Sequence, residues 1–338
     1  MTYKVVRVGV PLPDELAEPE RRKLREVGAE LVMHPYSGED DLIAAVRDAD
    51  AVINAGGRFP RRVIDAMARA KVLVQGSVGY DAIDVDTATE RGLPVANLFD
   101  YCIEEVATHA MTLILACARR LFFMDRVVRG GDWGRDRRGM MAAIGPVERL
   151  SETTLGIVGF GNIGKLVAQR ARGFGWRMLA ADPFVKPEVA AQHGAELVPI
   201  EELLRQSDYV TLHVFLNDQT RHMIAGPQLA LMKPTAYLVN TCRGPIVDEP
   251  ALIEALRSGR LAGAGLDVFE QEPIDPNNPL LQMDNVILTP HVAVYSRKAI
   301  ELNRTQPFDE VVRVLSGEWP RGLVNRSLRE RLTTLKDG

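Results

Sequence analysis

The sequence predicts an α/β protein built from two doubly wound units with parallel sheets. Short apolar runs alternate with amphipathic segments along most of the 338 residues, and short turns join them. This alternation is typical of parallel strands connected by helices. The chain is long enough for one large or two medium domains. Its 46% of hydrophobic and 25% of charged residues are typical of a globular protein.

Charge and composition exclude several classes of function. The net charge of −4 gives no electrostatic reason to expect nucleic acid as a partner. The first residues lack the layout of a signal peptide, and the most apolar segment, Val106–Ala118, is too short to span a bilayer. Cys102, Cys117 and Cys242 are widely spaced and form no metal-ligand pattern. We therefore expect a cytoplasmic protein with reduced thiols, no metal site and no membrane partner.

The N-terminal part of the chain contains the first unit. Its strands are expected at Lys4–Val10, Glu30–His34, Ala51–Asn54, Val72–Gln75 and Leu93–Asn97. Helices are expected at Glu20–Val27, Asp40–Asp48, Arg61–Ala68 and Asp84–Arg91, and residues 11–19 are expected to be a loop. Because strands and helices alternate, this part is predicted to be a small α/β domain of its own.

A glycine-containing turn, residues 76–81, follows the fourth strand. Two glycines just past a strand end leave backbone N–H groups at the carboxyl edge of the sheet, where open α/β sheets bind ligands. Such a turn can hold a carboxylate without a cationic side chain. A purely structural turn is the alternative, and this stretch alone does not decide between them.

The second unit begins with a long apolar helix at Glu104–Leu121, and the chain is expected to cross between domains near Cys102. Residues 126–146 are expected to be irregular. Their basic side chains are Arg126, Arg129, Arg135, Arg137 and Arg138, around Trp133. This segment guides an acidic substrate, contacts another subunit, or is simply a solvated loop.

The most informative stretch is residues 154–182, which predicts a strand, a glycine turn, a helix, a second strand and an acid. In dinucleotide binding, Gly159 allows the tight turn, Gly161 lets the backbone approach the pyrophosphate, and Gly164 lets the helix pack closely on the strand. The N-terminus of the helix offers N–H groups and its positive dipole end to the phosphates. The alternative is a plain turn between strand and helix.

Asp182 indicates the type of dinucleotide. It lies about 20 residues beyond the last glycine, where an acid accepts hydrogen bonds from the adenosine ribose hydroxyls. A carboxylate there repels a 2′-phosphate, and no Arg or Lys follows before Lys186. The sequence therefore favours NAD over NADP.

The remaining elements of the second half also alternate. Strands are expected at 196–198, Tyr209–Val214, Ala236–Asn240, Ala262–Val268 and Val286–Thr289. Helices are expected at Pro187–His193, Pro199–Gln206, Gln228–Met232, Glu249–Ser258 and Ala299–Leu315.

Three polar side chains that follow strand ends could perform chemistry together: Arg243, Glu272 and His291. An arginine fork binds a carboxylate, a histidine exchanges a proton near neutral pH, and a carboxylate beside it orients the ring. With a nicotinamide, this set suits the interconversion of a 2-keto acid and a 2-hydroxy acid. The alternatives are a surface ion pair for the arginine, an exposed loop for the glutamate and a structural histidine. Of the other histidines, only His213 ends a strand at the cofactor edge.

These segments resemble the D-isomer-specific 2-hydroxyacid dehydrogenases. The matching runs are residues 76–84 (GSVGYDAID), 155–164, 232–234 (MKP), 238–244 (LVNTCRG), 265–273 (GLDVFEQEP) and 289–291 (TPH). The resemblance implies a Rossmann cofactor domain, residues 103–298, inserted into a flavodoxin-like substrate domain, residues 1–102 and 299–330, with a cleft between them and a tail at 331–338. It also implies a homodimer formed through the cofactor domain.

The resemblance implies that Arg243 binds the substrate carboxylate and polarises the carbonyl, while His291, paired with Glu272, is the acid and base. Asp267 would face the nicotinamide amide. The residues expected to bind NAD are Gly159, Gly161, Asn162, Ile163, Gly164, Asp182, His213, Val214, Thr220, Thr241, Cys242, Arg243, Asp267 and His291. Those expected to bind substrate are Arg243, Asn54 at the edge of the first domain, and Val78 and Gly79 through their backbone N–H groups.

Residues 212–217 and 291–296 resemble the branch of this family that contains the C-terminal-binding-protein corepressors. The favoured hypothesis is an NAD-dependent oxidoreductase that interconverts a small D-2-hydroxy acid and its 2-keto acid. The alternative is a dimeric protein-binding module that senses NAD(H) with little turnover.

Overall fold

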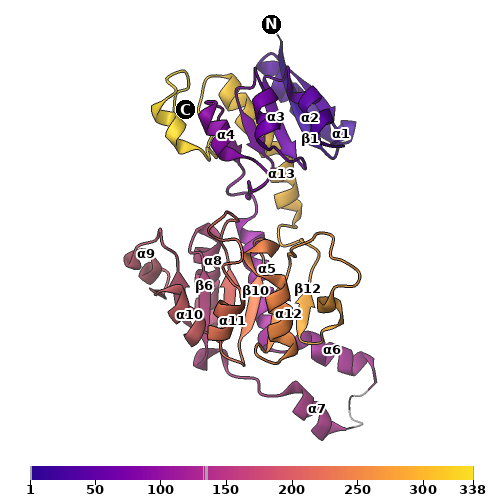
Figure 1. The fold of residues 1–338 in the computed structure, drawn as a ribbon, viewed down its shortest axis with the longest axis vertical. Coiled ribbons are helices and arrows are strands. Elements are labelled where there is room, and N and C mark those ends of the chain that lie inside the picture. The colour runs from indigo at the N-terminus through magenta and orange to yellow at the C-terminus, as the bar shows by residue number, and fades with distance from the viewer. Residues whose placement is uncertain (1, 132, 134–135, 338) are drawn as a thin grey trace. The chain divides into compact units, whose positions relative to one another are not determined.

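The computed structural model describes residues 2–131, 133 and 136–337. It divides the chain into two compact units (Figure 1). Unit 1 comprises Met1–Tyr101 and Ser296–Gly338, and unit 2 comprises Cys102–Tyr295. Unit 2 is therefore an insertion in the chain of unit 1.

Unit 1 contains a five-stranded sheet in the order β2-β1-β3-β4-β5, with every neighbouring pair parallel. Its strands are β1 Tyr3–Gly9, β2 Ala29–His34, β3 Ala51–Ala55, β4 Leu73–Gln75 and β5 Val95–Asn97. Its helices are α1 Asp14–Glu26, α2 Glu39–Val46, α3 Arg61–Ala66, α4 Val85–Glu90 and α13 Arg297–Leu315, with a short 3₁₀ turn η5 at Arg326–Glu330. This strand order is the flavodoxin-like order, so the predicted fold class of this unit is confirmed.

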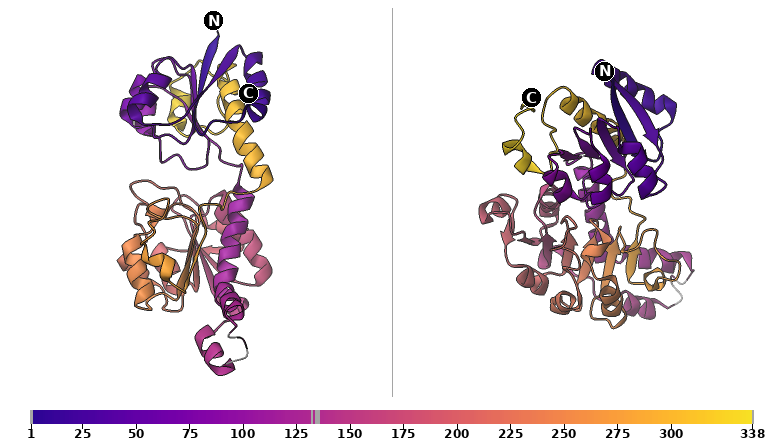
Figure 2. Two further views of the ribbon diagram at one scale, coloured as in Figure 1. Left: turned by 90° about the vertical axis from the view of Figure 1, so that its right-hand side faces the viewer. Right: turned by 45° about the horizontal axis from the view of Figure 1, so that its top comes forward.

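Alternate residues along the strands of unit 1 face two different layers of helices. Val6 and Val8 pack with residues of α2, α3 and α4, whereas Val5 packs with residues of α1 and α13. Phe308 of α13 is fully buried in the second layer. Figure 2 shows helices on both sides of this sheet. The C-terminal helix thus completes a core that the first hundred residues begin.

Two predictions for unit 1 differ from the structure. The stretch predicted as a loop is largely helical, since α1 begins at Asp14 and contains Pro19. Burial of Ala17 and Leu24 against the sheet supports this helix despite the proline. The predicted separate tail also packs onto unit 1: the Trp319 N–H donates to Lys336 O, at 2.9 Å, and Leu335 contacts the core.

Unit 2 contains a seven-stranded parallel sheet in the order β12-β11-β10-β9-β6-β7-β8. Its strands are β6 Thr154–Val158, β7 Arg177–Ala181, β8 Ala195–Leu197, β9 Tyr209–Leu212, β10 Tyr237–Asn240, β11 Gly263–Leu266 and β12 Val286–Leu288. Its helices are α5 Ile103–Ala118, α6 Leu121–Arg129, α7 Arg137–Ile144, α8 Asn162–Ala171, α9 Pro187–Gln192, α10 Ile200–Gln206, α11 Gly226–Leu231 and α12 Glu249–Arg257. This is the predicted Rossmann order with one further strand.

Helices cover both faces of the unit 2 sheet. Residues of α5, α8 and α9 pack with Leu155 and Ile157, while residues of α10, α11 and α12 pack with Val158 and Leu179. The change of strand order beside β6 brings β6 and β9 together. In open α/β sheets, ligands bind outside the carboxyl ends of the strands at such a point.

The segment predicted to be irregular is partly helical. The helix of residues 103–118 ends at an arginine pair, and Arg120 adopts a left-handed conformation with a φ of 48° before α6 begins. A second helix, α7, covers residues 137–144, and Arg135 lies outside the described residues. No single helix in the described part of the chain meets the length and hydropathy expected of a membrane span. The pair α5 and α6 meets them only together, bent by 62°.

Candidate active site

The predicted cofactor residues gather at the carboxyl edge of the unit 2 sheet. Those that directly follow a strand are Gly159 after β6, Asp182 after β7, His213 after β9, Thr241 after β10 and Asp267 after β11. Because all strands of this sheet are parallel, these residues share one edge.

The glycine turn after β6 has no room for side chains at two of its glycines. Gly159 has a φ of +86°, and a Cβ there would lie 2.4 Å from the His213 carbonyl oxygen. A Cβ on Gly164 would lie 2.2 Å from the Gly159 carbonyl oxygen, so α8 packs directly on the turn. A Cβ on Gly161 would meet no atom within 4 Å. The turn is therefore closed toward the protein and open at Gly161, where a ligand can approach the backbone.

Helix α8 begins at Asn162, and Gly161 precedes it. The first helical N–H groups, including those of Asn162, Ile163 and Gly164, have no acceptor within their own helix. These donors and the positive end of the helix dipole fit a phosphate group.

The Asp182 carboxylate joins the turn to the end of β7. One oxygen accepts a hydrogen bond from the Phe160 N–H at 2.8 Å, and the other accepts one from the Phe184 N–H at 2.9 Å. Each carboxylate oxygen can accept more than one hydrogen bond. The half-buried acid therefore keeps the capacity to bind ribose hydroxyls while it holds the turn.

Two buried polar atoms at this edge have no partner among the described residues: His213 Nδ1 and Thr241 Oγ1. Burial lowers the pKa of His213 to about 3, so its ring is neutral. An unpartnered buried polar atom is costly, and a polar ligand at this edge would relieve that cost. The glycine turn, the helix N-terminus, the acid and these two atoms together fit a dinucleotide.

The other predicted cofactor contacts lie in the loops after β9 and β10. Cys242 Sγ lies 3.0 Å from Asn240 Oδ1, and burial raises the pKa of the Cys242 thiol. The Thr220 hydroxyl donates to Phe215 O at 2.6 Å, so it holds its own loop. Val214 packs on the core behind the same edge. Among the described residues, no group of three or more His, Cys, Asp or Glu side chains is arranged to hold a metal ion.

The structure brings the predicted imidazole and carboxylate together. His291 Nδ1 lies 2.6 Å from Glu272 Oε2, and Glu272 Oε1 accepts a hydrogen bond from the Phe269 N–H at 3.0 Å. Burial opposes ionisation of Glu272, but the hydrogen bonds from His291 and Phe269 and the charges of His291 and Arg243 outweigh it and lower the pKa of Glu272. Because Glu272 takes Nδ1, Nε2 is the ring nitrogen available for proton exchange with a ligand.

Arg243 lies close to this pair because two loops approach each other closely. The next residue, Gly244, lies against the loop that carries Glu272: a Cβ there would lie 1.8 Å from the Phe269 carbonyl oxygen. Arg243 Nη1 donates to the Cys242 carbonyl at 2.8 Å, and the positive charge contributes to the lowered pKa of Glu272. In such a set, the guanidinium is suited to bind the carboxylate of an acid, and the imidazole is suited to protonate the adjacent carbonyl.

Asp267 is fully buried rather than open to a ligand. Its carboxylate accepts hydrogen bonds from Thr289 Oγ1 at 2.6 Å, the Val292 N–H at 3.0 Å and the Ala293 N–H at 2.8 Å. Its carbonyl accepts the His291 N–H at 2.8 Å. In the structure the carboxylate therefore holds the residues on both sides of the histidine, and its contact with the nicotinamide amide stays a prediction.

His109, which is not among the predicted site residues, also contacts the residues that hold His291. Its Nε2 lies 3.0 Å from Thr289 Oγ1 and 3.5 Å from Asp267 Oδ1. No motif connects a histidine on α5 with a loop after β12, so the sequence offered no signal. His291 itself has a φ of 52°, a left-handed conformation that costs free energy unless its surroundings hold it.

The predicted substrate residues of unit 1 lie in the turn after β4 and at the end of β3. The Val78 and Gly79 N–H groups donate to no group in the described part of the chain. Asn54 is only 1% exposed, and its amide is bonded to Gly57 O and Gln75 Oε1. The side chain of Asn54 therefore holds its own surroundings in the structure, and its contact with a substrate stays a prediction.

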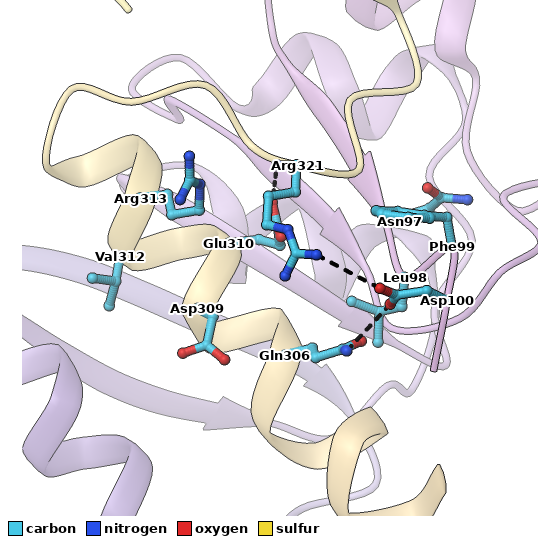
Figure 3. Close-up of a pocket in the computed structure, with 10 residues that line it drawn as sticks. All are labelled: Asn97, Leu98, Phe99, Asp100, Gln306, Asp309, Glu310, Val312, Arg313 and Arg321. Atoms are coloured by element: carbon cyan, nitrogen blue, oxygen red, sulfur yellow. Dashed lines mark hydrogen bonds and ion pairs between the residues drawn. The ribbon is translucent and has the colours of Figure 1, made fainter. Parts of the chain in front are cut away.

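Unit 1 also contains a pocket of about 300 Å³ between residues 98–100 and α13. Within its lining, Asp100 accepts a hydrogen bond from Gln306 and pairs with Arg321 (Figure 3). None of the predicted site residues lines this pocket.

A Rossmann sheet with an open glycine turn, an acid at the end of the next strand and an imidazole–carboxylate pair beside an arginine defines a dinucleotide-dependent dehydrogenase. Residues 111–293 match the NAD binding domain of the D-isomer specific 2-hydroxyacid dehydrogenases. The chain belongs to this family, and it is an NAD(P)-dependent oxidoreductase of 2-hydroxy acids and their 2-keto partners.

Named relatives agree with this family. A glyoxylate reductase from Korarchaeum cryptofilum is 43% identical over 85% of this chain and 86% of its own length. A D-lactate dehydrogenase from Aquifex aeolicus, solved with NAD and lactic acid, has a TM-score of 0.80 and 29% identity, covering 93% of this chain and 96% of that one. An NADPH-dependent glyoxylate/hydroxypyruvate reductase from Sinorhizobium meliloti, solved with NADP and malonate, has a TM-score of 0.81 and 29% identity, covering 96% and 98%. These findings do not support the predicted corepressor-like branch.

The openness of the turn at Gly161 gives a first prediction. Gly161→Ala should leave the melting temperature nearly unchanged, since the added methyl group meets no protein atom, but should weaken NADH binding about tenfold, or 1.4 kcal/mol. Gly164→Ala, the matched control, should instead destabilise the protein by about 1–3 kcal/mol, because its methyl group collides with the turn. Fluorescence titration and thermal unfolding measure both effects. Unchanged NADH affinity in Gly161→Ala would contradict the predicted backbone approach.

The buried carboxylate of Asp267 gives a prediction on pH. Burial alone would raise its pKa, but the bonds from His109, Thr289 and the two N–H groups lower it below the ordinary value of 3.8. The stabilisation is therefore complete above the pKa of the unfolded chain and is lost as pH falls through the lower pKa of the folded state.

Asp267→Asn should accordingly reduce the free energy of unfolding by about 2 kcal/mol at pH 7, and the difference from wild type should narrow below about pH 4. Asp284→Asn, which removes an exposed partner of Arg126, should cost less than about 1 kcal/mol at every pH. Urea denaturation at several pH values measures both variants. A difference for Asp267→Asn that stays constant down to pH 3 would contradict the assigned role of the carboxylate.

Proposed function

We propose that this protein reduces glyoxylate and related small 2-keto acids to the D-2-hydroxy acids with NADH. The observation that carries the proposal is the 2.6 Å contact of His291 with Glu272, beside Arg243, at the edge of a sheet that also carries the dinucleotide turn. The name of the Korarchaeum cryptofilum relative, a glyoxylate reductase at 43% identity, supports glyoxylate as the first substrate to test.

In the proposed reaction, the Arg243 guanidinium binds the substrate carboxylate and draws electron density from the adjacent carbonyl. When bound, the reduced nicotinamide supplies the hydride that the carbonyl carbon receives. His291 donates the proton from Nε2 to the carbonyl oxygen, and Glu272 holds the ring through its contact with Nδ1. In the reverse direction His291 takes the proton from the hydroxyl group.

Unit 2 is the proposed cofactor unit, and NAD is its proposed cofactor. The glycine turn and the start of α8 would hold the pyrophosphate, Asp182 the adenosine ribose, and His213 and Thr241 a polar part of the nicotinamide half. The preference for NAD is supported by the negative charge of Asp182 at the position where NADP carries its additional phosphate. Substrate carboxylate binding by the Val78 and Gly79 N–H groups is the proposed role of unit 1.

We propose a homodimer formed through unit 2. Helix α6 has no buried residue, although it carries large apolar side chains. The exposed apolar residues of α6 and α7 are Leu121 at 56%, Phe122 at 53%, Val128 at 54% and Met141 at 57%. A surface of this kind is typical of subunit contacts, and a second copy of the same face is the simplest partner. We also propose a cytoplasmic location, which suits three cysteines that carry thiols rather than disulfides.

The catalytic assignment predicts that His291→Ala lowers kcat for glyoxylate at least about a hundredfold. The chain contains a matched control: His222 also has a positive φ, and its Nε2 lies 2.7 Å from Glu270 Oε1. His222→Ala should therefore keep turnover within about twofold of wild type. NADH oxidation followed at 2-keto acid saturation distinguishes the two variants, and equal losses in both would refute the assignment.

The cofactor assignment predicts that kcat/KM is at least about tenfold higher with NADH than with NADPH, because Asp182 repels the 2′-phosphate. Asp182→Asn, which keeps the shape of the side chain and removes its charge, should narrow this ratio severalfold. Glu254→Gln on the exposed side of α12 should leave the ratio unchanged. A wild-type protein that prefers NADPH would overturn the assignment.

The dimer assignment predicts a particle of about twice the chain mass of 37.3 kDa in light scattering after size exclusion. Replacing both Leu121 and Phe122 by Glu should shift the particle toward one chain, because charge at the centre of an interface is costly to bury. Ile300→Glu, the same kind of change at an exposed residue of α13, should leave the mass unchanged. A monomeric wild-type protein at micromolar concentration would disprove the dimer.

A further inference from the structure

In the turn after β4, the carbonyl groups of residues 76–79 each accept a hydrogen bond. Gly76 O accepts from Asn303 Nδ2, Ser77 O from the Leu98 N–H at 3.2 Å, Val78 O from Asn97 Nδ2 at 2.7 Å, and Gly79 O from Ser77 Oγ at 2.8 Å. Three of the donors come from β5, from the segment that follows it and from α13, and the fourth, Ser77, belongs to the turn itself.

The direction of these carbonyls fixes the direction of the N–H groups. In a planar trans peptide the C=O and the following N–H point to opposite sides. Since Asn97 holds Val78 O toward the protein body, the Gly79 N–H of the same peptide group points away from it. Since the Leu98 N–H holds Ser77 O, the Val78 N–H points away as well. The two donors assigned to the substrate carboxylate are thus aimed by groups that need not touch the substrate.

Asn97 is suited to this task because it is itself fixed. It ends β5, is 7% exposed, and its own N–H donates to Gly322 O at 2.9 Å. A Cβ on Gly322 would lie 2.0 Å from the Asn97 carbonyl oxygen, so the backbone on which Asn97 stands is closely packed. In Figure 3, the Asn97 amide points away from the centre of the pocket that its backbone borders.

A second set of hydrogen bonds holds the next peptide group. Asn54 Nδ2 donates to Gln75 Oε1 at 2.8 Å, Gln75 Nε2 donates to Ser77 Oγ at 2.8 Å, and Ser77 Oγ donates to Gly79 O. Because Gln75 occupies the acceptor side of the hydroxyl, the hydroxyl proton is directed at Gly79 O. Through this chain of hydrogen bonds, which we call the relay, the buried Asn54 side chain helps to orient the Gly79 carbonyl.

We propose that Asn97 is a positioning residue for substrate binding. Ser77 has the same task for the next peptide group, whose carbonyl Gly79 O it holds at the end of the hydrogen-bond chain that starts at Asn54. The proposal rests on the proposed function, in which the Val78 and Gly79 N–H groups bind the substrate carboxylate. Without the Asn97 amide, Val78 O loses its hydrogen-bond donor. The Val78–Gly79 peptide group can then rotate, and the Gly79 N–H no longer points in a fixed direction.

The experiment compares Asn97→Leu with Asn325→Leu in the full-length protein. Asn325 is also buried in unit 1, where it binds the Val95 N–H and Leu93 O, but it has no bond to the turn. Both variants should lower the melting temperature. Only Asn97→Leu should raise the KM for glyoxylate, by about tenfold, with kcat changed less than about twofold and NADH affinity unchanged.

A hydroxyl series tests the relay independently. Ser77→Ala should raise the KM for glyoxylate about fivefold, and Ser77→Thr, which keeps the hydroxyl group, should stay close to wild type. Ser37→Ala removes a surface hydroxyl that bonds to Asp41 in the same unit, and it should leave the KM for glyoxylate unchanged. The dissociation constant of oxalate from the NADH-loaded protein, measured by calorimetry, should follow the KM in every variant.

Equal KM values for wild type and Asn97→Leu, or equal rises in Asn97→Leu and Asn325→Leu, would overturn the positioning role while wild-type turnover stands. A wild-type protein that neither reduces a 2-keto acid nor binds oxalate would overturn both the proposed function and the positioning role. The behaviour of the wild type therefore distinguishes failure of the proposed function from failure of the positioning role alone.

Discussion

The candidate site depends on one buried carboxylate. Asp267 has no exposed surface, yet it is held ionised by four donors, and three of them belong to the loop that carries His291. A histidine in a left-handed conformation would otherwise relax toward a less strained backbone. Because Asp267 follows β11 directly, the position of the imidazole is set by the sheet and not by the loop. The position of the proposed proton donor thereby depends on a residue at the end of a sheet strand.

A second constraint joins the arginine to the imidazole. The loops after β10 and β11 approach so closely that only glycine fits at position 244. This contact places the Arg243 charge near Glu272, whose ionised form it favours, and Glu272 in turn holds the His291 ring. Side chains from three loops are therefore coupled electrostatically, because His291 and Arg243 both favour the ionised form of Glu272.

Local patterns in the sequence predicted the parallel strands, the glycine turn and the residues after the strand ends, because each depends on nearby residues or on a fixed spacing. Contacts between distant segments left no such pattern. Helix α1 includes Pro19 because burial of Leu24 against the sheet stabilises it. The segment around Lys336 packs on unit 1 through its hydrogen bond with Trp319. His109 contacts Thr289, which lies 180 residues away in the sequence. Asn54 follows the same rule: its place at a strand end was predictable, but its burial depended on Gln75, a residue on another strand.

The order of the segments in unit 1 has a consequence for the newly made chain. Residues 1–101 leave the ribosome long before α13, whose Phe308, Val311 and Val314 cover one side of their sheet. Until residues 297–315 have been translated, that apolar side lacks the part of its cover that α13 supplies, whereas residues 102–295 emerge as an uninterrupted stretch that can fold at once. The N-terminal strands therefore keep an apolar surface exposed during synthesis. Such a surface is prone to aggregate, and a chaperone that binds it would prevent this.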